Sequence, residues 1–498
     1  MYASGEAPVW LHVHYGRQRG AKPWNRVRLR LSDETWFDDF VPPDLAGQPP
    51  FQYISEGYWR TADVSGKSLV LAPDRREAFL ETAACVAYVR LEAVAGPETW
   101  PRETKRLVTY YDGNFMGHFV ASPAEVASQI APLARSDCRL VLWNTCREDT
   151  CYYPTRVGHV LPDHGTPGLY PHWMGRDLHE MLRRGEDPLR EACRVAHAAG
   201  LQIFASYRRL TCRLPPHAFP LHPKAMLAAR PDLWCRGEAG EPLPHLSLAF
   251  PEVRRRMIDL LSEQAGNYDL DGVHFFFCRG VPFVLFEDPF LAAFDREFGE
   301  DPRRLPLTDE RVWRVRAGFV LALFRDLRAR LDAIGRRRGR QFEVAVTVMN
   351  RPATSAYFGL DVEALIRERL VDVLLPFPCH YLPPDLGESR LLPEFVREFA
   401  DLARGSGVRI YPDAGYDYSA GAEPLWRRAA AFYAAGADGL QISQCGVRHG
   451  VNSFVARLGH VAELDQAEAW TAQAVRAVRV AEVAGLSLDP RRGIATCG

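Results

Sequence analysis

From about Arg106 onward, the chain alternates short apolar segments with longer segments of helical periodicity, and this alternation constrains the fold more than any other feature. Eight strands are expected, at residues 107–112, 139–145, 201–207, 272–277, 342–349, 371–377, 408–413 and 438–443. Seven helices fit between them, at residues 123–134, 188–199, 251–266, 311–338, 362–369, 393–404 and 423–435. Eight strand–helix units in succession predict an α/β fold of the (β/α)8 TIM-barrel type.

Local signals support the boundaries of these elements. Ser122 and Pro123 suit an N-cap and the first position of a helix. Gly200, Gly407 and Gly436 stand where a helix has to end before the next strand begins. A doubly wound sheet would also suit this chain length, but no GxGxxG turn follows the first strand. The barrel is therefore the preferred prediction.

The first hundred residues follow a different pattern, in which short alternating segments are separated by Gly, Pro and Asp. Val27, Leu29 and Leu31, for example, are separated by single arginines. Period-two alternation of this kind predicts a small β-sandwich. We therefore expect three parts: an N-terminal β-sandwich at 1–103, the barrel at 104–460 and a C-terminal helical tail at 461–498.

Composition excludes several classes of partner. The 498 residues carry a formal net charge of -1, so the sequence shows no basic surface for nucleic acid. No apolar run is long enough to cross a bilayer, and the N-terminus lacks the pattern of a signal peptide. The 11 cysteines form no CxxC pair and many lie in apolar segments, which predicts free thiols in the reducing cytoplasm. The sequence carries no signal for an oligomeric state.

In a (β/α)8 barrel, functional side chains lie at the C-terminal ends of the strands and in the loops that follow them. Polar and aromatic residues recur at those positions here. The candidate binding residues are Asp112, Asn144, Trp173, Arg208, Arg279, Asn350, His380, Tyr381 and Gln444. Amide, carboxylate and guanidinium groups hydrogen-bond to sugar hydroxyls, and aromatic rings stack on the CH faces of sugars. This mixture predicts a carbohydrate ligand.

The segment NYDLDGVHFFFCRG, at residues 267–280, is the most informative strand of the eight. Asp271 and Gly272 form a tight turn that opens the strand, so Asp271 is interpreted as a turn residue at the far end of the barrel. The strand ends in the three successive phenylalanines at 275–277. Enzymes that cleave sugars usually carry a carboxylate at such a strand end. The strand therefore fits a (β/α)8 barrel but lacks the carboxylate that glycoside hydrolysis would need there.

The region from about Arg106 to Leu458 resembles the glycosyl hydrolase-like 10 family of TIM-barrel proteins. The resemblance is carried by YPTR at 153–156, AHAAGLQIFASYR at 196–208, RPDLW at 230–234, the segment 248–259 and YDLDGVHF at 268–275. The most specific of these is the YDxDGxH pattern. The resemblance implies a (β/α)8 fold and hydrolysis of O-glycosidic bonds in an oligo- or polysaccharide.

The sequence departs from that family at one position of consequence. Members usually carry one or two aspartates directly after the DGxH strand, where this chain has Phe276 and Phe277. Glycosidases of most families need two carboxyl groups, one on each side of the scissile bond. Three carboxylates are candidates to supply them: Asp413 at the end of the seventh strand, Glu287 in the fourth loop and Asp112 at the end of the first strand.

The leading hypothesis is a glycoside hydrolase with Asp413 as nucleophile or base and Glu287 as acid. The main alternative is a catalytically inactive barrel that binds a saccharide, because Phe276 and Phe277 replace the usual acid. A lyase or isomerase with a different acid–base pair is a third, weaker hypothesis. The N-terminal domain is either an accessory carbohydrate-binding unit or a lid.

Metal chemistry is less favoured by the histidine positions. His12 and His14 are closely spaced but fall in the N-terminal domain, and His380 and His449 have no ligand spacing. No metal and no cofactor is therefore expected.

Overall fold

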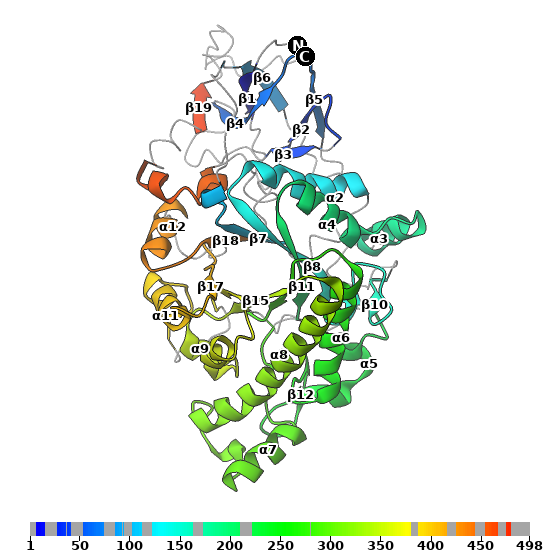
Figure 1. The fold of residues 1–498 in the computed structure, drawn as a ribbon, viewed down its shortest axis with the longest axis vertical. Coiled ribbons are helices and arrows are strands. Elements are labelled where there is room, and N and C mark those ends of the chain that lie inside the picture. Colours follow the sequence, from blue (N-terminus) through cyan, green and yellow to red (C-terminus); the bar gives the residue numbers. More distant parts are fainter. Residues whose placement is uncertain are drawn as a thin grey trace, which may run out of the picture. The chain divides into compact units, whose positions relative to one another are not determined.

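The computed structural model describes residues 6–14, 27–35, 37–40, 53–73, 85–91, 93, 102–111, 122–162, 173–209, 222–278, 280–379, 387–415, 425–443, 454–466 and 475–479. It divides into two compact units. The larger is Lys105–Gln444, and the smaller combines Met1–Thr104 with Cys445–Gly498. Figure 1 labels many of the helices and strands of both.

Eight parallel strands form the centre of the larger unit, in the sheet order β18-β7-β8-β11-β14-β15-β16-β17. Their bounds are β7 (Leu107–Tyr111), β8 (Cys138–Arg147), β11 (Gln202–Arg208), β14 (Gly272–Phe276), β15 (Glu343–Val348), β16 (Val373–Pro376), β17 (Arg409–Ile410) and β18 (Leu440–Ser443). Each coincides with one of the eight expected strands. Two short strands, β9 (Thr150–Cys151) and β10 (His159–Val160), extend the sheet beside β8.

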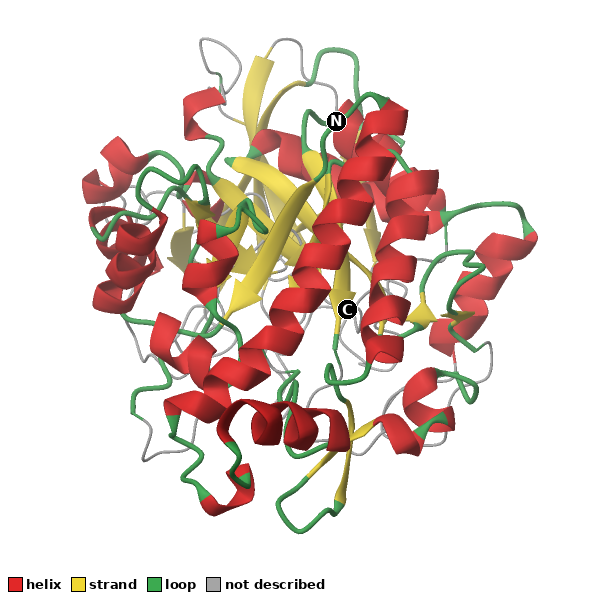
Figure 2. Cartoon of the chain, turned by 60° about the horizontal axis from the view of Figure 1, so that its bottom comes forward, coloured by secondary structure: helices red, strands yellow, loops and turns green. Residues whose placement is uncertain are grey.

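Helices follow the strands, and in Figure 2 the red helices surround the yellow strands of this unit. The expected ones are α2 (Pro123–Ile130), α4 (Pro188–Ala198), α6 (Pro251–Asn267), α8 (Glu310–Arg338), α10 (Val362–Arg367), α11 (Pro393–Ala403) and α12 (Leu425–Ala434). The connections add α3 (Trp173–Arg183), α5 (Met226–Ala229), α7 (Asp288–Phe298), α9 (Pro352–Tyr357) and the antiparallel pair β12 (Trp234–Arg236) and β13 (Pro242–Leu246). Short 3-10 helices lie at Arg102–Thr104, Ala131–Arg135, Pro231–Leu233, Pro302–Arg304, Phe454–Arg457 and Val461–Gln466.

Side-chain caps explain where several helices begin. The Ser122 hydroxyl accepts the Glu125 N–H at 3.3 Å, and Asp187 accepts the Leu189 N–H at 3.0 Å. Pro123 and Pro188 take the first helical positions, where a missing N–H costs no hydrogen bond. The N-cap and proline signals in the sequence therefore have the structural role expected of them.

Three aspartates, each one or two residues before a strand, lock neighbouring strands in register. Asp271, Asp372 and Asp438 each donate their backbone N–H to a carbonyl on the strand of the parallel sheet that comes before it along the chain, at 3.0, 2.8 and 3.0 Å. Each carboxylate also accepts the N–H of that same partner residue, at 2.9, 2.7 and 2.8 Å. The partners are, in order, Ile203, Val344 and Ile410. These paired bonds, which we call the aspartate clamps, confirm that Asp271 is a structural turn residue.

Backbone hydrogen bonds also connect the two ends of the sheet order. Asp438 N–H donates to Ile410 O at 3.0 Å, Gln441 N–H to Pro412 O at 2.9 Å, and Ala414 N–H to Gln441 O at 3.0 Å. Asp413 and Gln441 form an isolated parallel bridge. Pro412 and, on β16, Pro376 have no N–H to donate, so the hydrogen-bond ladders on both sides of β17 are interrupted and it is two residues long although extended backbone was predicted over 408–413.

The smaller unit contains two antiparallel sheets. One has the order β19-β4-β1-β6, formed by β19 (Val475–Arg479), β4 (Tyr53–Asp63), β1 (Glu6–His14) and β6 (Cys85–Leu91). The other has the order β3-β2-β5, formed by β3 (Asp38–Phe40), β2 (Val27–Leu31) and β5 (Leu69–Pro73). The short strands expected in the first hundred residues are therefore present, and their packing into a sandwich stays a prediction.

The C-terminal segment differs from the expected helical tail. Its described residues form a 3-10 helix at Val461–Gln466 and the strand β19, which pairs antiparallel with β4. In the sequence VRAVR the two valines favour a strand, and the free edge of β4 supplies the backbone partners. The segment from Cys445 groups with the N-terminal unit. Among the described residues, no helix is both long and apolar enough to span a membrane.

The aspartate clamps generate a prediction about stability. Asp372→Ala removes the acceptor for the Val344 N–H and the ion pair with Arg328, whose N···O distance is 2.6 Å. We expect the free energy of unfolding to fall by about 1–3 kcal/mol, because a partly buried donor loses its partner. Urea titration followed by circular dichroism measures the change. The exposed Asp332 provides the control, and an equal loss in Asp332→Ala would contradict the role of the clamp.

Candidate functional site

The phenylalanines of β14 point alternately to the two faces of the sheet. Phe275 stacks on Phe277 with ring centroids 5.2 Å apart, and both contact Phe324 of α8. Phe276 instead stacks on Tyr110 of β7, at 4.6 Å and 9° between the rings. This alternation is the period of two that any strand imposes. Phe277 therefore packs under helix α8, and only Phe276 occupies the position expected for a catalytic acid.

The contact between Tyr110 and Phe276 shows which face is the inner one. Strands β7 and β14 are separated by β8 and β11 in the sheet order. Neighbouring strands are about 4.8 Å apart, so in a flat sheet these two would be roughly 14 Å apart. Their rings touch only because the sheet curls, and both side chains project from its concave side.

His274 lies one layer deeper on the same face. Its Nδ1 is 2.8 Å from the Ser206 hydroxyl on β11, and its Nε2 is 2.8 Å from the Thr347 hydroxyl on β15. A neutral imidazole donates from one nitrogen and accepts at the other, so both contacts can be hydrogen bonds. Burial lowers the pKa of His274 to about 3, which keeps the ring neutral. The histidine of the DGxH pattern thus links three adjacent strands.

Polar side chains from the neighbouring strands surround the Tyr110–Phe276 pair. Asn144 at the end of β8 donates from Nδ2 to the Tyr110 hydroxyl at 3.4 Å. The Arg208 guanidinium at the end of β11 lies 5.6 Å from the Phe276 ring centroid, and Phe377 meets the same ring edge-on at 5.4 Å. We call these five residues the strand-end cluster. It brings together two of the predicted binding residues, Asn144 and Arg208.

Asp413, predicted at the end of the seventh strand, lies three residues beyond β17 and is 1% exposed. Its Oδ2 accepts a hydrogen bond from Gln441 Nε2 at 2.9 Å. The backbone bridge between the same two residues aligns their side chains. Gln441 was not among the predicted residues, because a glutamine inside a strand looks like any polar position until the neighbouring strand is known.

Asn350 follows β15 and is fully buried. Its Nδ2 donates to the backbone carbonyls of Glu388 at 2.6 Å and Arg390 at 2.9 Å, so the amide holds the loop that follows β16. In the described part of the chain its Oδ1 has no hydrogen-bond partner. Asn350 thus anchors this loop, and its role in binding stays a prediction.

Glu287, the predicted acid, precedes α7 and is fully buried. Its carboxylate accepts the Leu285 N–H at 3.0 Å and the Arg236 N–H at 3.1 Å, which fastens the β12–β13 pair to the start of α7. Burial raises its pKa, and these backbone donors oppose that shift. Among the described residues, none of its hydrogen bonds reaches the strand-end cluster or Asp413.

The remaining predicted residues lie beyond what the structure describes. Asp112, Arg279, His380, Tyr381 and Gln444 are outside the described residues. Trp173 begins α3, but its side chain is not described. The roles of these six residues stay predictions.

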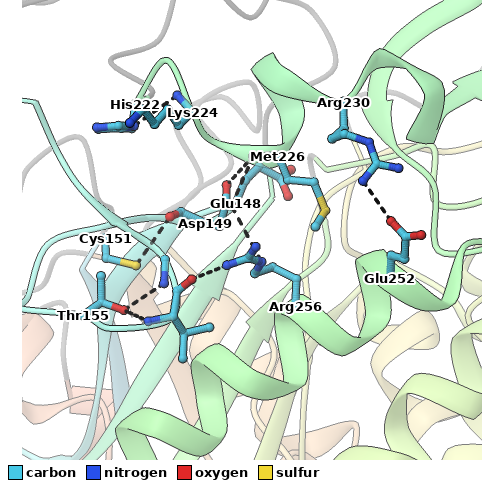
Figure 3. Close-up of polar contacts among 12 residues, drawn as sticks. Glu148, Asp149, Cys151, Thr155, His222, Lys224, Met226, Arg230, Glu252 and Arg256 are labelled. Carbon is cyan, nitrogen blue, oxygen red and sulfur yellow. Dashed lines mark hydrogen bonds and ion pairs between the residues drawn. The ribbon is translucent and has the colours of Figure 1, made fainter.

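The turn after β8 holds two buried acids, Glu148, which the sequence places in the loop after the second strand, and Asp149, which was not predicted (Figure 3). Glu148 has a positive φ of 48° and accepts the Tyr207 hydroxyl at 2.9 Å. Asp149 accepts the Met226 N–H at 3.0 Å and lies 4.0 Å from the Arg256 Nε. Burial raises the pKa of Asp149. A non-glycine residue at positive φ is strained, and such strain is held by surrounding contacts. These contacts tie the turn to β11, α5 and α6.

The YPTR segment that carries part of the family resemblance has a structural role. Glu263 of α6 accepts the Tyr153 hydroxyl at 2.9 Å, the Thr155 hydroxyl at 2.6 Å and the Arg156 N–H at 2.6 Å. One helix carboxylate therefore anchors the loop that follows β9.

Among the described residues, no group of three or more His, Cys, Asp and Glu side chains is arranged to hold a metal ion.

The buried His274 generates a prediction about pH. Its pKa is about 3 in the folded protein, against an ordinary value of 6.5. Between these two pH values the imidazole is therefore protonated in the unfolded chain and neutral in the folded protein. Stability therefore falls as the pH drops from 6.5 toward 3, by about 1.4 kcal/mol per pH unit for this group. In His274→Asn the slope between about pH 6 and 4 should be smaller by that amount, as measured by urea unfolding at several pH values. Equal slopes in both proteins would show that His274 is not neutral when folded.

Comparison with known proteins gives fold neighbours rather than a family. No protein-family model matches the sequence, and no curated protein matches it.

Similar solved structures include α-L-fucosidase isoenzyme 2 from Paenibacillus thiaminolyticus, with a TM-score of 0.44 and 14% identity over 74% of this chain and 50% of that one. The glycoside hydrolase domain of PgaB (BpsB) from Bordetella bronchiseptica has a TM-score of 0.43 and 15% identity over 74% and 97%. The β-galactosidase from the psychrophilic Marinomonas ef1 has a TM-score of 0.42 and 15% identity over 76% and 60%. The chain thus spans half of the fucosidase and three fifths of the galactosidase. These neighbours are glycoside hydrolases, and at such low scores and identities the likeness carries no argument about activity.

Proposed function

We propose that the larger unit is a carbohydrate-active (β/α)8 barrel that binds its ligand at the C-terminal ends of the strands. Two observations support a closed barrel: eight parallel strands follow one another in sequence order, and backbone hydrogen bonds join residues 410–414 to 438–441. The membership in the glycosyl hydrolase-like 10 family that the sequence resembles is part of this proposal. So is the packing of the two N-terminal sheets as a sandwich.

The observation that carries the proposal is the strand-end cluster. Tyr110, Asn144, Arg208 and Phe276 come from four successive strands and meet at the strand ends, where barrel enzymes bind their substrates. Amide and guanidinium groups can hydrogen-bond to hydroxyls, and aromatic edges can contact CH groups. An oligo- or polysaccharide presents both kinds of surface.

The hydrolase form of the proposal assigns the chemistry to two carboxyl groups. Asp413 acts as nucleophile or base, held in place by the Gln441 amide. Glu287 acts as the acid, and its raised pKa favours the protonated form that donates to a leaving group. For this step Glu287 has to exchange its backbone contacts for the glycosidic oxygen.

A second candidate function is saccharide binding without catalysis, and Phe276 favours it. This ring fills the position of the expected acid and is 3% exposed between Tyr110, Phe377 and Arg208. A phenyl ring transfers no proton, so the cluster can bind a sugar without cleaving it. The two functions differ in a single measurable quantity, the appearance of product.

Under the hydrolase proposal, Asp413→Asn lowers kcat on any aryl glycoside that the wild type cleaves, by a factor on the order of 10²–10⁴. Asparagine keeps the size of the side chain and loses the charge that the mechanism needs. Release of the aryl group from a panel of glycosides measures the effect, with Asp332→Asn as the exposed control. Unchanged turnover in Asp413→Asn removes Asp413 from the mechanism. Saturable binding by calorimetry, without product from any sugar, establishes the second candidate instead.

Glu287→Gln separates a catalytic from a structural carboxylate. Loss of a general acid slows substrates with poor leaving groups much more than activated aryl glycosides, whose leaving group needs no proton. A structural role, in which Glu287 only accepts the Leu285 and Arg236 N–H groups, predicts lower thermal stability and equal effects on both substrates. Comparing kcat on a phenyl and a dinitrophenyl glycoside, together with the melting temperature, distinguishes the two.

A further inference from the structure

Two cysteines face each other across the hairpin at the end of β8. In the antiparallel pairing of β8 with β9, Cys146 lies opposite Cys151 and Arg147 lies opposite Thr150. The connection is a two-residue turn of Glu148 and Asp149. Neither cysteine takes part in the chemistry proposed above for the strand ends.

The hydrogen bonds of the hairpin define the kind of pair they form. Tyr152 N–H donates to Thr145 O at 2.9 Å, so the position before the cysteines is a hydrogen-bonded pair. Hydrogen-bonded and non-hydrogen-bonded pairs alternate along an antiparallel ladder, which makes Cys146 and Cys151 a non-hydrogen-bonded pair. The Cα atoms of such pairs are about 4.5 Å apart, within the range of about 4.4–6.8 Å over which disulfides form.

The two thiols are enclosed together. Both cysteines are fully buried and reduced in the structure. The Cys151 S–H donates to the Asp149 carbonyl, with Sγ 3.7 Å from the oxygen (Figure 3). A Cβ added at Gly158 would be 2.8 Å from the Cys151 sulfur, so the packing leaves this thiol little room to turn away from the hairpin. Burial raises the pKa of Cys151, and the neighbouring Cys146 raises it further.

We propose that Cys146 and Cys151 are a disulfide site, whose bond forms when the protein meets an oxidising low-molecular-weight disulfide. One cysteine, as thiolate, attacks the sulfur–sulfur bond of the oxidant and releases one thiol. The sulfur of the other cysteine then attacks the protein sulfur of this mixed disulfide and releases the second thiol. The two protein thiols lose two electrons and two protons, and the two sulfurs of the oxidant gain them.

The bond closes a ring around the turn that carries Glu148 and Asp149. That turn holds the Tyr207 hydroxyl and the Met226 N–H, and Asn144 precedes Cys146 by two residues. Oxidation therefore fixes the end of β8, from which one member of the strand-end cluster projects. Because burial raises the pKa of Cys151, this thiol is rarely the reactive thiolate, and the folded protein is expected to react slowly. This inference does not depend on the proposed carbohydrate function.

Trypsin makes the bond directly observable, because Arg147 lies between the two cysteines. Cleavage after Arg139, Arg147 and Arg156 yields the peptides 140–147 and 148–156, each with one of the two cysteines. The full chain is incubated with oxidised glutathione, blocked with N-ethylmaleimide in urea, digested and analysed by mass spectrometry. We expect the two peptides to appear joined, with a mass two hydrogen atoms below their sum.

A second sample is produced in an oxidising secretory compartment. There the cysteines meet the oxidant during folding, before burial slows their reaction. Cys193→Ser, a change of another buried cysteine, should leave the joined peptide intact, and Cys151→Ser should abolish it. Joined peptides in either wild-type sample support the site. Two separately blocked peptides in both samples, or a bond from either cysteine to a different partner, overturn it.

Discussion

Register between neighbouring parallel strands is the constraint on which the candidate site depends, and the aspartate clamps help to set it. Each clamp joins a residue at the start of one strand to the residue before the next through two hydrogen bonds, one from the backbone and one to the carboxylate. A slip by one residue would reverse the face on which every following side chain projects. With the register between β11 and β14 held at the start of these strands, Arg208 and Phe276 lie side by side on the same inner face at their ends.

What meets at those ends is an aromatic centre with polar neighbours. Phe276 stacks on Tyr110 and accepts the Arg208 cation over its ring, where a carboxylate would have formed an ion pair with that arginine. A guanidinium beside an aromatic face is attracted by the ring quadrupole, so Phe276 helps to hold the Arg208 side chain in place. Because a phenyl ring transfers no proton, the proposed catalysis depends on other groups, among them Asp413, whose carboxylate accepts a hydrogen bond from Gln441.

Much of the fold could be predicted, because each strand and helix leaves its own periodicity in the sequence. The eight strands and seven helices lie where the alternation of apolar segments predicts them. The exceptions have long-range causes. Strand β19 exists because β4, from the opposite end of the chain, offers it an edge. The hairpin of β12 and β13 is held by Glu287, whose carboxylate accepts backbone N–H groups from two separate segments. Neither partnership is visible in a local pattern.

The sequence by itself determined the order of strands and helices, the strand ends at which function is expected, and the absence of an acid after the DGxH strand. Those properties depend on spacing along the chain and on residue type. Only the tertiary structure decided that Phe276 faces inward while Phe277 packs under α8, that Tyr110 reaches across from β7, and that Glu287 binds backbone groups. Contacts between distant strands depend on how the sheet curls, and that curvature arises from the packing of all eight strands together rather than from any one segment.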